Sequence, residues 1–430
     1  MLFSPTYKEC VLSVSFSNYL KNKSGMPKVV MAHQKMFNEE KISYIYLFSV
    51  KKMVFHEHGM LFCLFGVIID GKYMGVYPIH KIIKEIGCLI EQGQEIHGIH
   101  IHHLLYIKLK YIKMILDAFQ NIPIVYYLHD YYCVCTNYTL RKNKDVYCGG
   151  EGLNSQCCKN CNSHKNSIKI ENKIGKLFSK YKDRLTFVSP SEATKEIFLR
   201  FRPEYQNQVI VIPHQKLIEV YKENMNPIER GKKIKIGFLG MPSKHKGWET
   251  WCKLVQQSDA NNYEYYVFNS SNKSYSNMHK EYVAFNEKNL DAMTQALRKN
   301  NIDIILMWAL WPETYSYTYY EAYSSNAYVL TNTISGNIMN AVQENGNGLV
   351  LEDEEALLSL FMNSKQMTEY VNKFRESRKC GPLFLEENSY IVEYTKKEKK
   401  EVRYQKQMYV NLYETIISGL LNRFNVTDNS

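Results

Sequence analysis

The sequence lacks the long apolar runs and the leader-like start that mark membrane-spanning or secreted chains. Its most apolar stretch, residues 60–69, has about half of the ~20 residues that a transmembrane helix requires. Asp70-Gly71 follows this stretch and is typical of a β-hairpin turn. Residues 1–20 have no basic region ahead of an apolar one, so we expect no signal peptide and a cytoplasmic protein.

Motifs of several other function classes are also missing. The chain has no Asp-x-Asp pair, no repeat of the solenoid type and no recognised nucleic-acid reading module. Its net charge of +11 suits a phosphate-bearing ligand, a nucleic acid or an anionic membrane surface. Without a reading module we expect no nucleic-acid partner, and a zinc-containing nucleic-acid-binding protein is the least favoured alternative.

Cysteine is unevenly distributed in the chain. Five of the eleven cysteines are scattered and are expected to fill apolar space: Cys10, Cys63, Cys88, Cys252 and Cys380. The other six lie in one insertion, residues 133–161: Cys133, Cys135, Cys148, Cys157, Cys158 and Cys161. One local cluster in a long chain favours a metal over a disulfide framework. A structural zinc ion held by Cys135, Cys148, one of Cys157 and Cys158, and Cys161 is one interpretation, and reduced thiols in a loop are the other.

Short β-branched runs alternate with segments of helical periodicity, which predicts two α/β domains with mostly parallel sheets. The strands expected in the first half are 11–16, 44–50, 60–68, 95–102, 123–130, 185–190 and 209–214. Those expected in the second half are 234–240, 263–269, 302–308, 328–332 and 348–352. Ligands of such doubly wound sheets bind beyond the carboxyl ends of the strands, so two facing domains predict a cleft.

The domain boundaries follow from the polar, turn-rich segment 216–233, which we interpret as a linker. It separates an N-terminal domain, 1–215, from a C-terminal domain, 234–400. The remaining residues, 401–430, contain an apolar stripe at four-residue steps over 408–424. We expect a helix there that packs back toward the N-domain. The alternative is a membrane-surface helix, because a lysine-rich run precedes it.

The turn after the first strand of the second domain is a candidate anion site. Gly240 ends the strand, Lys244, His245 and Lys246 fall in the turn, and Gly247 precedes the next helix. Backbone N–H groups and the positive end of the helix dipole favour phosphate at such a helix start. The turn has neither G-x-G-x-x-G spacing nor a Walker motif, so its signal alone is weak.

A second strand–loop–helix unit carries two glutamates. Glu313 follows Pro312 in a loop, where a carboxylate can accept hydrogen bonds from sugar or ribose hydroxyls. Glu321 has a competing structural interpretation, because Thr318 and Glu321 fit a capping box at the start of a helix. Four tyrosines lie between or beside these carboxylates and are expected to line the cleft and pack the loop: Tyr315, Tyr317, Tyr319 and Tyr320.

Together these segments resemble the retaining glycosyltransferases of the GT-B architecture, family 4 (glycosyl transferases group 1). That family has a glycine-ended strand, a Lys-Gly pair, and then two glutamates separated by seven residues. The matching positions are Gly240, Lys246-Gly247, Glu313 and Glu321-Ala322. In the first half, segments 100–105, 128–135, 188–198 and 211–214 resemble the family's strand ends and its proline-serine-glutamate helix start.

The resemblance implies a role for each matching residue. Lys246 is implied to contact the donor diphosphate, Glu321 the ribose and Glu313 the transferred sugar. His129 is implied to lie in the N-domain wall of the cleft near the reacting carbon. The donor site is expected to include Gly240, Lys244, His245, Lys246, Gly247, Glu313, Thr314, Tyr315, Ser316, Glu321 and Gly336, with Glu313, His129 and Lys246 in the catalytic step. Ser191 and Glu192 match less securely and are interpreted equally well as a helix start.

The sequence departs from the family at two points. Met241 and Pro242 stand where an arginine is common, so Lys244 or His245 is expected to supply the second positive charge. The family's glycine-rich turn is reduced to residues 335–340, with only Gly336 kept. Both departures affect the expected contacts to phosphate and sugar.

The expected activity is transfer of a sugar, with retained anomeric configuration, from a nucleotide diphosphate donor. UDP is the default nucleotide, and no catalytic metal is expected, because lysine and helix N-termini can stabilise the leaving phosphate. Histidines 100, 102, 103 and 129 are interpreted as hydrogen-bonded cleft residues rather than ligands. The expected acceptor is a glycan or lipid-linked oligosaccharide of a bacterial surface polysaccharide, at the inner face of the membrane. The alternative is a non-catalytic sugar-nucleotide or glycan-binding protein on the same fold.

Overall fold

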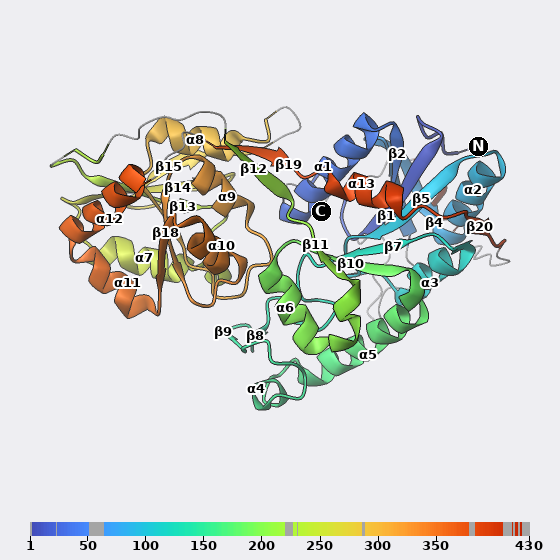
Figure 1. The fold of residues 1–430 in the computed structure, drawn as a ribbon, viewed down its shortest axis with the longest axis horizontal. Helices are drawn as coiled ribbons and strands as arrows, with labels where there is room; N and C mark the ends of the chain where they lie inside the picture. Colours follow the sequence, from blue (N-terminus) through green and yellow to red (C-terminus); the bar gives the residue numbers. More distant parts are fainter. Residues whose placement is uncertain are drawn as a thin grey trace.

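The computed structural model describes residues 2–22, 24–50, 64–219, 227–229, 231–285, 289–377 and 383–406, with 415, 418, 419, 422 and 423. Two α/β domains lie next to each other along the long axis of the molecule (Figure 1). The helix expected over 408–424 falls for the most part outside the described residues. No helix in the described part of the chain is long and apolar enough to cross a bilayer.

The N-domain is built on an eight-stranded sheet in the order β11-β10-β7-β5-β1-β2-β3-β4. Six strands are parallel: β1 (Glu9–Ser15), β2 (Ile42–Ser49), β5 (Glu95–Ile101), β7 (Ile124–Tyr127), β10 (Leu185–Ser189) and β11 (Val209–Val211). The hairpin expected at Asp70-Gly71 is present as the antiparallel pair β3 (Leu64–Ile69) and β4 (Lys72–Pro78). The main flanking helices are α1 (Gly25–Glu39), α2 (Ile79–Glu91), α3 (Leu109–Ala118), α5 (His164–Lys180) and α6 (Glu192–Phe201). Short 3-10 turns cover Lys182–Arg184 and Pro203–Gln208.

The C-domain has a six-stranded, wholly parallel sheet in the order β15-β14-β13-β16-β17-β18. Its strands are β13 (Ile234–Leu239), β14 (Tyr263–Asn269), β15 (His279–Tyr282), β16 (Ile304–Met307), β17 (Tyr328–Asn332) and β18 (Gly348–Leu351). Its helices are α7 (Trp248–Gln257), α8 (Ala292–Asn300), α9 (Tyr317–Ser324), α10 (Asn337–Asn345), α11 (Glu354–Phe361) and α12 (Ser364–Ser377). In sequence order this is the 3-2-1-4-5-6 arrangement of a doubly wound fold, which reverses between β13 and β16.

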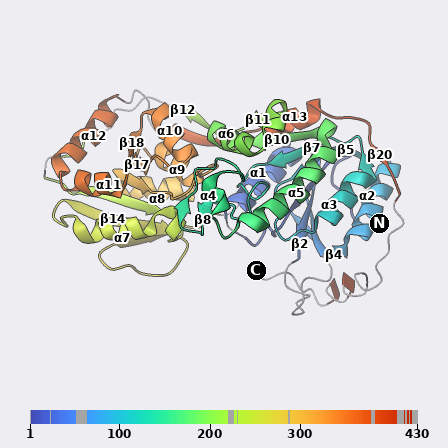
Figure 2. The same cartoon turned by 90° about the horizontal axis from the view of Figure 1, so that it is seen from below.

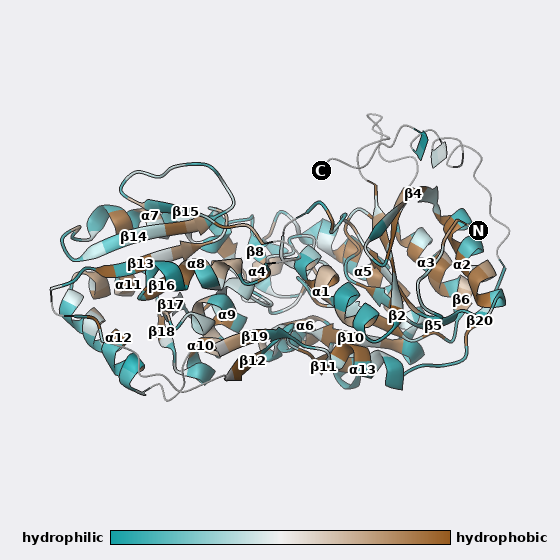
Figure 3. Cartoon of the chain, turned by 90° about the horizontal axis from the view of Figure 1, so that it is seen from above, coloured by the Kyte–Doolittle hydropathy of each residue, from teal (hydrophilic) through white to brown (hydrophobic). Residues whose placement is uncertain are grey.

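The strands form because their residues are apolar on both faces. Every residue of β2 is buried, as are all but the first residue of β1. Continuous apolar strands suit parallel sheets covered by helices on both sides. Figure 3 shows the same partition, with hydrophobic colour along the sheets and hydrophilic colour on the outer helical surfaces. The predicted pair of Rossmann-like domains is therefore confirmed.

The chain passes between the domains twice at one place. β12 (Gln215–Glu219) and β19 (Leu383–Glu387) pair antiparallel and cross the middle of the molecule in Figure 1. The segment interpreted as a linker thus begins in a strand. After β19, α13 (Tyr390–Lys397) packs back on the N-domain, where Ile391 and Val392 are buried. Farther on, β20 (Arg403–Tyr404) pairs with β6 (Phe119–Gln120) of the N-domain.

The cysteine-rich insertion forms a small lobe of the N-domain. It contains the hairpin β8 (Arg141–Lys142) and β9 (Val146–Tyr147) and the short helix α4 (Gln156–Lys159). In Figure 2 it lies at the boundary between the two domains. The hairpin turn reaches the C-domain, because Asp145 Oδ1 lies 2.8 Å from Lys244 Nζ.

Candidate functional site

A cavity of about 920 Å³ lies between the domains, beyond the ends of β13 and β16. Both domains contribute to its walls. The N-domain supplies Gly25, Lys28, His129 and Tyr138, among others, and the C-domain supplies Gly240, His245, Lys246, Glu313, Tyr317 and Glu321. The size is that of a site for a small molecule or cofactor. The cavity lies at the switch point of the C-domain sheet, where doubly wound folds bind ligands.

The turn after β13 brings Lys246 to this cavity. A Cβ atom on Gly240 would lie 3.4 Å from Lys246 Nζ, so the ammonium group sits against the end of the strand. Lys246 ends a 3-10 turn over Lys244–Lys246, and Gly247 has φ +79°. A Cβ on Gly247 would lie 2.2 Å from the Trp308 carbonyl oxygen, so glycine is required for this close approach. Helix α7 starts immediately afterwards.

The other two basic residues of the turn behave differently. Lys244 is directed to Asp145 and, at 3.9 Å, to Glu249, and its side chain is about half exposed. His245 lines the cavity, but burial lowers its pKa to about 4, with further lowering by Lys246 and Arg141. His245 is therefore neutral near pH 7. Of the three, Lys246 is the one that presents a positive charge to the cavity.

Glu313 is held by the loop that follows β16. Trp311 Nε1–H donates to Glu313 Oε1 at 3.0 Å. The Glu313 backbone N–H donates to the Ser335 carbonyl at 3.2 Å, and the Asn337 N–H donates to the Glu313 carbonyl at 2.9 Å. Burial raises the pKa of the Glu313 carboxyl, and the nearby Lys246 opposes that effect. The two residues that the sequence predicted together are therefore neighbours in the cavity wall.

Gly336 packs closely against the backbone of the loop that carries Glu313. Its φ is +63°, and a Cβ atom there would lie 2.7 Å from the Pro312 backbone and 2.8 Å from Glu313 N. A bridge pairs Gly336 with Glu313. Gly336, the glycine that carried the resemblance at this turn, is thus the position at which a side chain would collide with the Glu313 loop.

Thr314 fastens the same loop to the N-domain. Its Oγ1–H donates to the His129 carbonyl at 2.7 Å. Its own carbonyl accepts from Ser191 Oγ at 2.9 Å and from Thr194 Oγ1 at 3.2 Å. Ser191 also caps α6, since its side chain accepts from the Thr194 N–H. Ser191 therefore caps a helix start, as one of its two interpretations holds. It also bonds to Thr314 of the other domain, a contact that the sequence did not suggest.

The competing interpretation of Thr318 and Glu321 as a capping box is wrong. Ser316 is the N-cap of α9, and its side chain accepts from the Tyr319 N–H at 3.3 Å. The helix begins earlier than the capping box requires, which leaves Glu321 beyond the first turn. Glu321 instead forms an ion pair of 2.9 Å with Lys28 Nζ, and both side chains are buried.

The tyrosines divide into two groups. Tyr315 and Tyr317 line the cavity and pack around His214, at centroid distances of 4.7 and 5.8 Å. Tyr320 stacks on Tyr315 at 4.6 Å. Tyr319 is fully buried and donates to Asn347 Oδ1 at 2.8 Å. Tyr319 is thus a core residue of α9, contrary to its expected place in the cleft.

His129 lines the opposite wall of the cavity. Its Nε2 lies 2.9 Å from His102 Nδ1, and the two rings stack at 5.2 Å. Burial lowers the pKa of His129 well below its usual range, and His214 is the next cause. His103 Nε2 pairs with Asp130 Oδ2 at 2.8 Å beside it. Of the four histidines expected in the cleft, His103 and His129 line the cavity, whereas His100 and His102 are hydrogen-bonded but fully buried behind it. His129 is neutral at physiological pH.

The sequence did not single out Lys28, His214 or Asp130. Each lies in the N-domain or at its edge, and each lines the cavity. Lys28 follows Ser24-Gly25, which begins a helix after the first strand of its domain as Gly247 does in the second domain. That parallel was the available signal for Lys28. His214 and Asp130 lie within segments that carried the resemblance.

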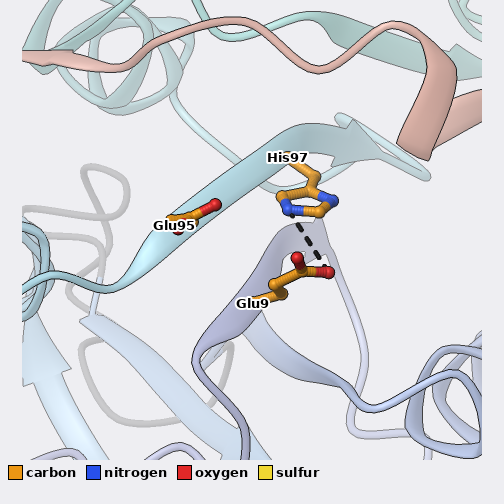
Figure 4. Close-up of side chains that lie close together, drawn as sticks. All are labelled: Glu9, Glu95 and His97. Atoms are coloured by element: carbon orange, nitrogen blue, oxygen red, sulfur yellow. Dashed lines mark ion pairs between the residues drawn. The ribbon is translucent and has the colours of Figure 1, made fainter.

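One group of metal-type side chains gathers elsewhere in the described residues. Glu9, Glu95 and His97 place their ligand atoms within 4.8 Å of one another (Figure 4). His97 Nε2 is 3.6 Å from Glu9 Oε2. Lys8 and Lys399 already pair with Glu95, and Lys399 lies 3.8 Å from Glu9. We interpret the group as an ion-pair cluster that ties the segment after α13 to β1 and β5.

The cysteines of the insertion lie near one another, but their sulfur atoms do not converge on one point. Burial raises the pKa of Cys158 to about 11, and Cys135, Cys148, Cys161 and Cys157 add to this effect. Cys158 Sγ also lies 3.4 Å from His164 Nδ1, a potential ligand that the sequence did not suggest. Among the described residues, no three cysteine sulfurs lie within 4.8 Å of one another. A tetrahedral thiolate site would bring them to roughly 3.8 Å, from a Zn–S distance of about 2.3 Å.

Comparison with known proteins places the fold. No family model and no curated protein matches the sequence. Among solved structures, sucrose-phosphate synthase from Thermosynechococcus elongatus is similar, with a TM-score of 0.51 and 11% identity over 85% of this chain and 94% of that one. Anabaena HepE in complex with UDP-glucose has a TM-score of 0.51 and 10% identity over 91% and 95% of the chains. TarM has a TM-score of 0.50 and 10% identity over 99% and 100%. These likenesses establish the two-domain GT-B fold.

Proposed function

We propose that the protein is a glycosyltransferase that takes a sugar from a nucleotide diphosphate donor bound between its domains. The observation that carries the proposal is the convergence of Lys246, Glu313 and Glu321 on one cavity. These residues come from two strand ends of the C-domain, at the switch point of its sheet. A cation beside paired carboxylates suits a diphosphate joined to a sugar and a ribose.

The chemistry assigns each group a task. The bond between the anomeric carbon and the diphosphate oxygen breaks, and a bond to an acceptor hydroxyl forms. Lys246 and the N-terminus of α7 stabilise the negative charge that develops on the leaving phosphate. The acceptor's proton passes to that phosphate, and the sugar keeps its anomeric configuration by front-face attack. Glu313 holds hydroxyls of the sugar, Glu321 holds the ribose, and His129 forms the facing wall.

UDP is the proposed nucleotide. A fold neighbour, HepE, is described in complex with UDP-glucose, which supports testing UDP-sugars first. The proposed acceptor is a glycan or a lipid-linked oligosaccharide in surface polysaccharide synthesis, met in the cytoplasm at the inner face of the membrane. The net charge of +11 supports association with an anionic surface.

The test is a panel of nucleotide sugars with two measurements, thermal stabilisation and release of free nucleotide diphosphate. One donor should raise Tm by mass action and release its nucleotide slowly even without acceptor. Lys246→Met should abolish both effects. Lys253→Met is the matched control, because Lys253 lies on α7 and is exposed. Stabilisation without release, even with glycan acceptors, would favour the non-catalytic binding protein, and no stabilisation would contradict both.

We also infer a structural zinc ion in the insertion, held by Cys161, Cys148, Cys135 and either Cys157 or Cys158. The gathering of these thiols supports it, and thiolates are the ligands that zinc prefers. Zinc would fix the lobe whose hairpin contacts Lys244 and contribute no step to the reaction. Metal analysis of the purified protein should find about one zinc ion per chain. Absence of zinc with all thiols titratable would overturn this inference.

A further inference from the structure

Lys28 is a buried cation that the proposed reaction leaves without a task. It lies in the first half of α1, in the N-domain, and its side chain is only 4% exposed. Its Nζ donates to Glu321 Oε1 at 2.9 Å, across the cavity from α1 to α9 in the C-domain. The ion pair therefore joins the two domains inside the candidate donor site.

The surroundings of Lys28 fix its ammonium group in place. Its Nζ lies 4.5 Å from the centroid of the Tyr317 ring and 5.4 Å from that of Phe285. Glu387 on β19 is also close enough that Lys28 lowers its pKa, against the larger effect of burial. A buried lysine is costly unless such partners compensate for lost water. Two carboxylates and two aromatic faces supply that compensation here.

The ion pair also constrains Glu321. Lys28 takes Oε1, which leaves Oε2 to accept a hydrogen bond from a ligand hydroxyl. A carboxylate that is 8% exposed would otherwise lose the solvation that keeps it charged. With Lys28 in place, the Glu321 carboxylate is held in one orientation before any ligand arrives. Preorganised acceptors of this kind bind better because they do not reorganise on binding.

We propose that Lys28 is a positioning residue that orients Glu321 toward a ribose hydroxyl of the donor. The proposal rests on the proposed function, because it concerns the ribose subsite of the same cavity. It differs from a direct contact of Lys28 with phosphate, in which Lys28 would play the same part as Lys246. It also differs from a purely structural tie, which would leave the selectivity for ribose hydroxyls unchanged.

The experiment compares calorimetric binding of UDP, its 2′-deoxy and 3′-deoxy analogues, and uridine. Wild type should bind UDP at least about tenfold more tightly than the analogue that lacks the hydroxyl held by Glu321, the usual loss when a buried acceptor is left unpaired. In Lys28→Met, UDP should bind no more than about twofold more tightly than that analogue. The affinities for UDP and for uridine should both fall. Lys35→Met is the matched control, because Lys35 is on the same helix but exposed; it should keep the wild-type ratio.

A double variant guards against misfolding. Lys28→Met with Glu321→Gln removes both members of the ion pair, and Glu387, whose pKa burial already raises to about 7, can take up a proton, so the variant should fold. It should bind UDP as weakly as Glu321→Gln alone, since the two residues act as a unit. The proposal is overturned if Lys28→Met keeps the wild-type ratio of affinities for UDP and the deoxy analogue, or if it weakens the binding of UDP but not that of uridine. It is also overturned if the fold-loss of UDP affinity in the double variant equals the product of the fold-losses in the two single variants. Failure of wild type to bind any of these ligands would instead overturn the proposed function along with it.

Discussion

At the scale of single residues, the charged side chains of the cavity are held in position by the residues they contact, and sequence spacing does not reveal all of these contacts. Glu313 was predicted because a carboxylate after a buried strand end has few structural reasons to be there. Its Trp311 and Ser335 contacts show how the loop aims it. Lys28 was missed because its partner Glu321 is 293 positions away along the chain, and periodicity carries no information at that separation.

Glu313→Gln should separate catalysis from folding. The amide keeps the shape of the side chain and can still accept from Trp311, while the charge beside Lys246 is lost. We expect the rate of donor cleavage to fall by about 100-fold or more, and Tm to change by only a few degrees. Nucleotide release and thermal unfolding measured on the same preparation check both parts. Full activity in the variant would show that the carboxylate charge has no part in the reaction.

Glu387 should make stability depend on pH. Burial raises its pKa from 4.5 to about 7. Between these values the folded protein keeps a proton that the unfolded chain has lost, so unfolding releases it and this contribution to stability falls as pH rises. Glu387→Gln removes the effect. The variant should therefore gain stability relative to wild type between pH 5 and pH 8, by up to about 3 kcal/mol. Urea unfolding at both pH values tests this, and a difference that is constant with pH would refute it.

At the scale of elements, the strands were predicted well because their residues are apolar on both faces. The second-domain strands expected over 234–240, 263–269 and 328–332 correspond closely to β13, β14 and β17. The capping-box interpretation placed the N-cap of α9 at Thr318 instead of Ser316, because both residues have capping side chains and the sequence does not rank them. β12 was not recognised within its polar segment, since its partner β19 is far along the chain.

Substitution of two separate glycines, one beside the Glu313 loop and one in open space, tests how tightly that loop is packed. Gly336→Ala should destabilise the protein by about 2–4 kcal/mol, because a Cβ there meets the Pro312 backbone at 2.7 Å in a left-handed conformation. Gly93 also has positive φ, but nothing lies within 4 Å of its Cβ position. Gly93→Ala should therefore cost only about 1 kcal/mol. Denaturant unfolding of both variants checks the difference, and equal losses would mean that the close contact is not responsible.

At the scale of the whole molecule, the order of strands in each sheet explains why the site lies where it does. Both sheets point the carboxyl ends of central strands toward one cavity, and the crossing pair β12–β19 with α13 holds the domains together. The resemblance predicted this architecture from motif order alone. It did not predict the contacts across the cavity, such as Thr314 to His129, because these depend on how two separately folded domains meet.

The most direct measurement is a crystal structure of the protein with UDP. The diphosphate should lie beside Lys246 and the first N–H groups of α7, and the ribose within hydrogen-bond distance of Glu321 Oε2. Nucleotide bound at another surface, or in the cavity with its ribose away from Glu321 and its phosphates away from Lys246, would contradict the proposed donor site.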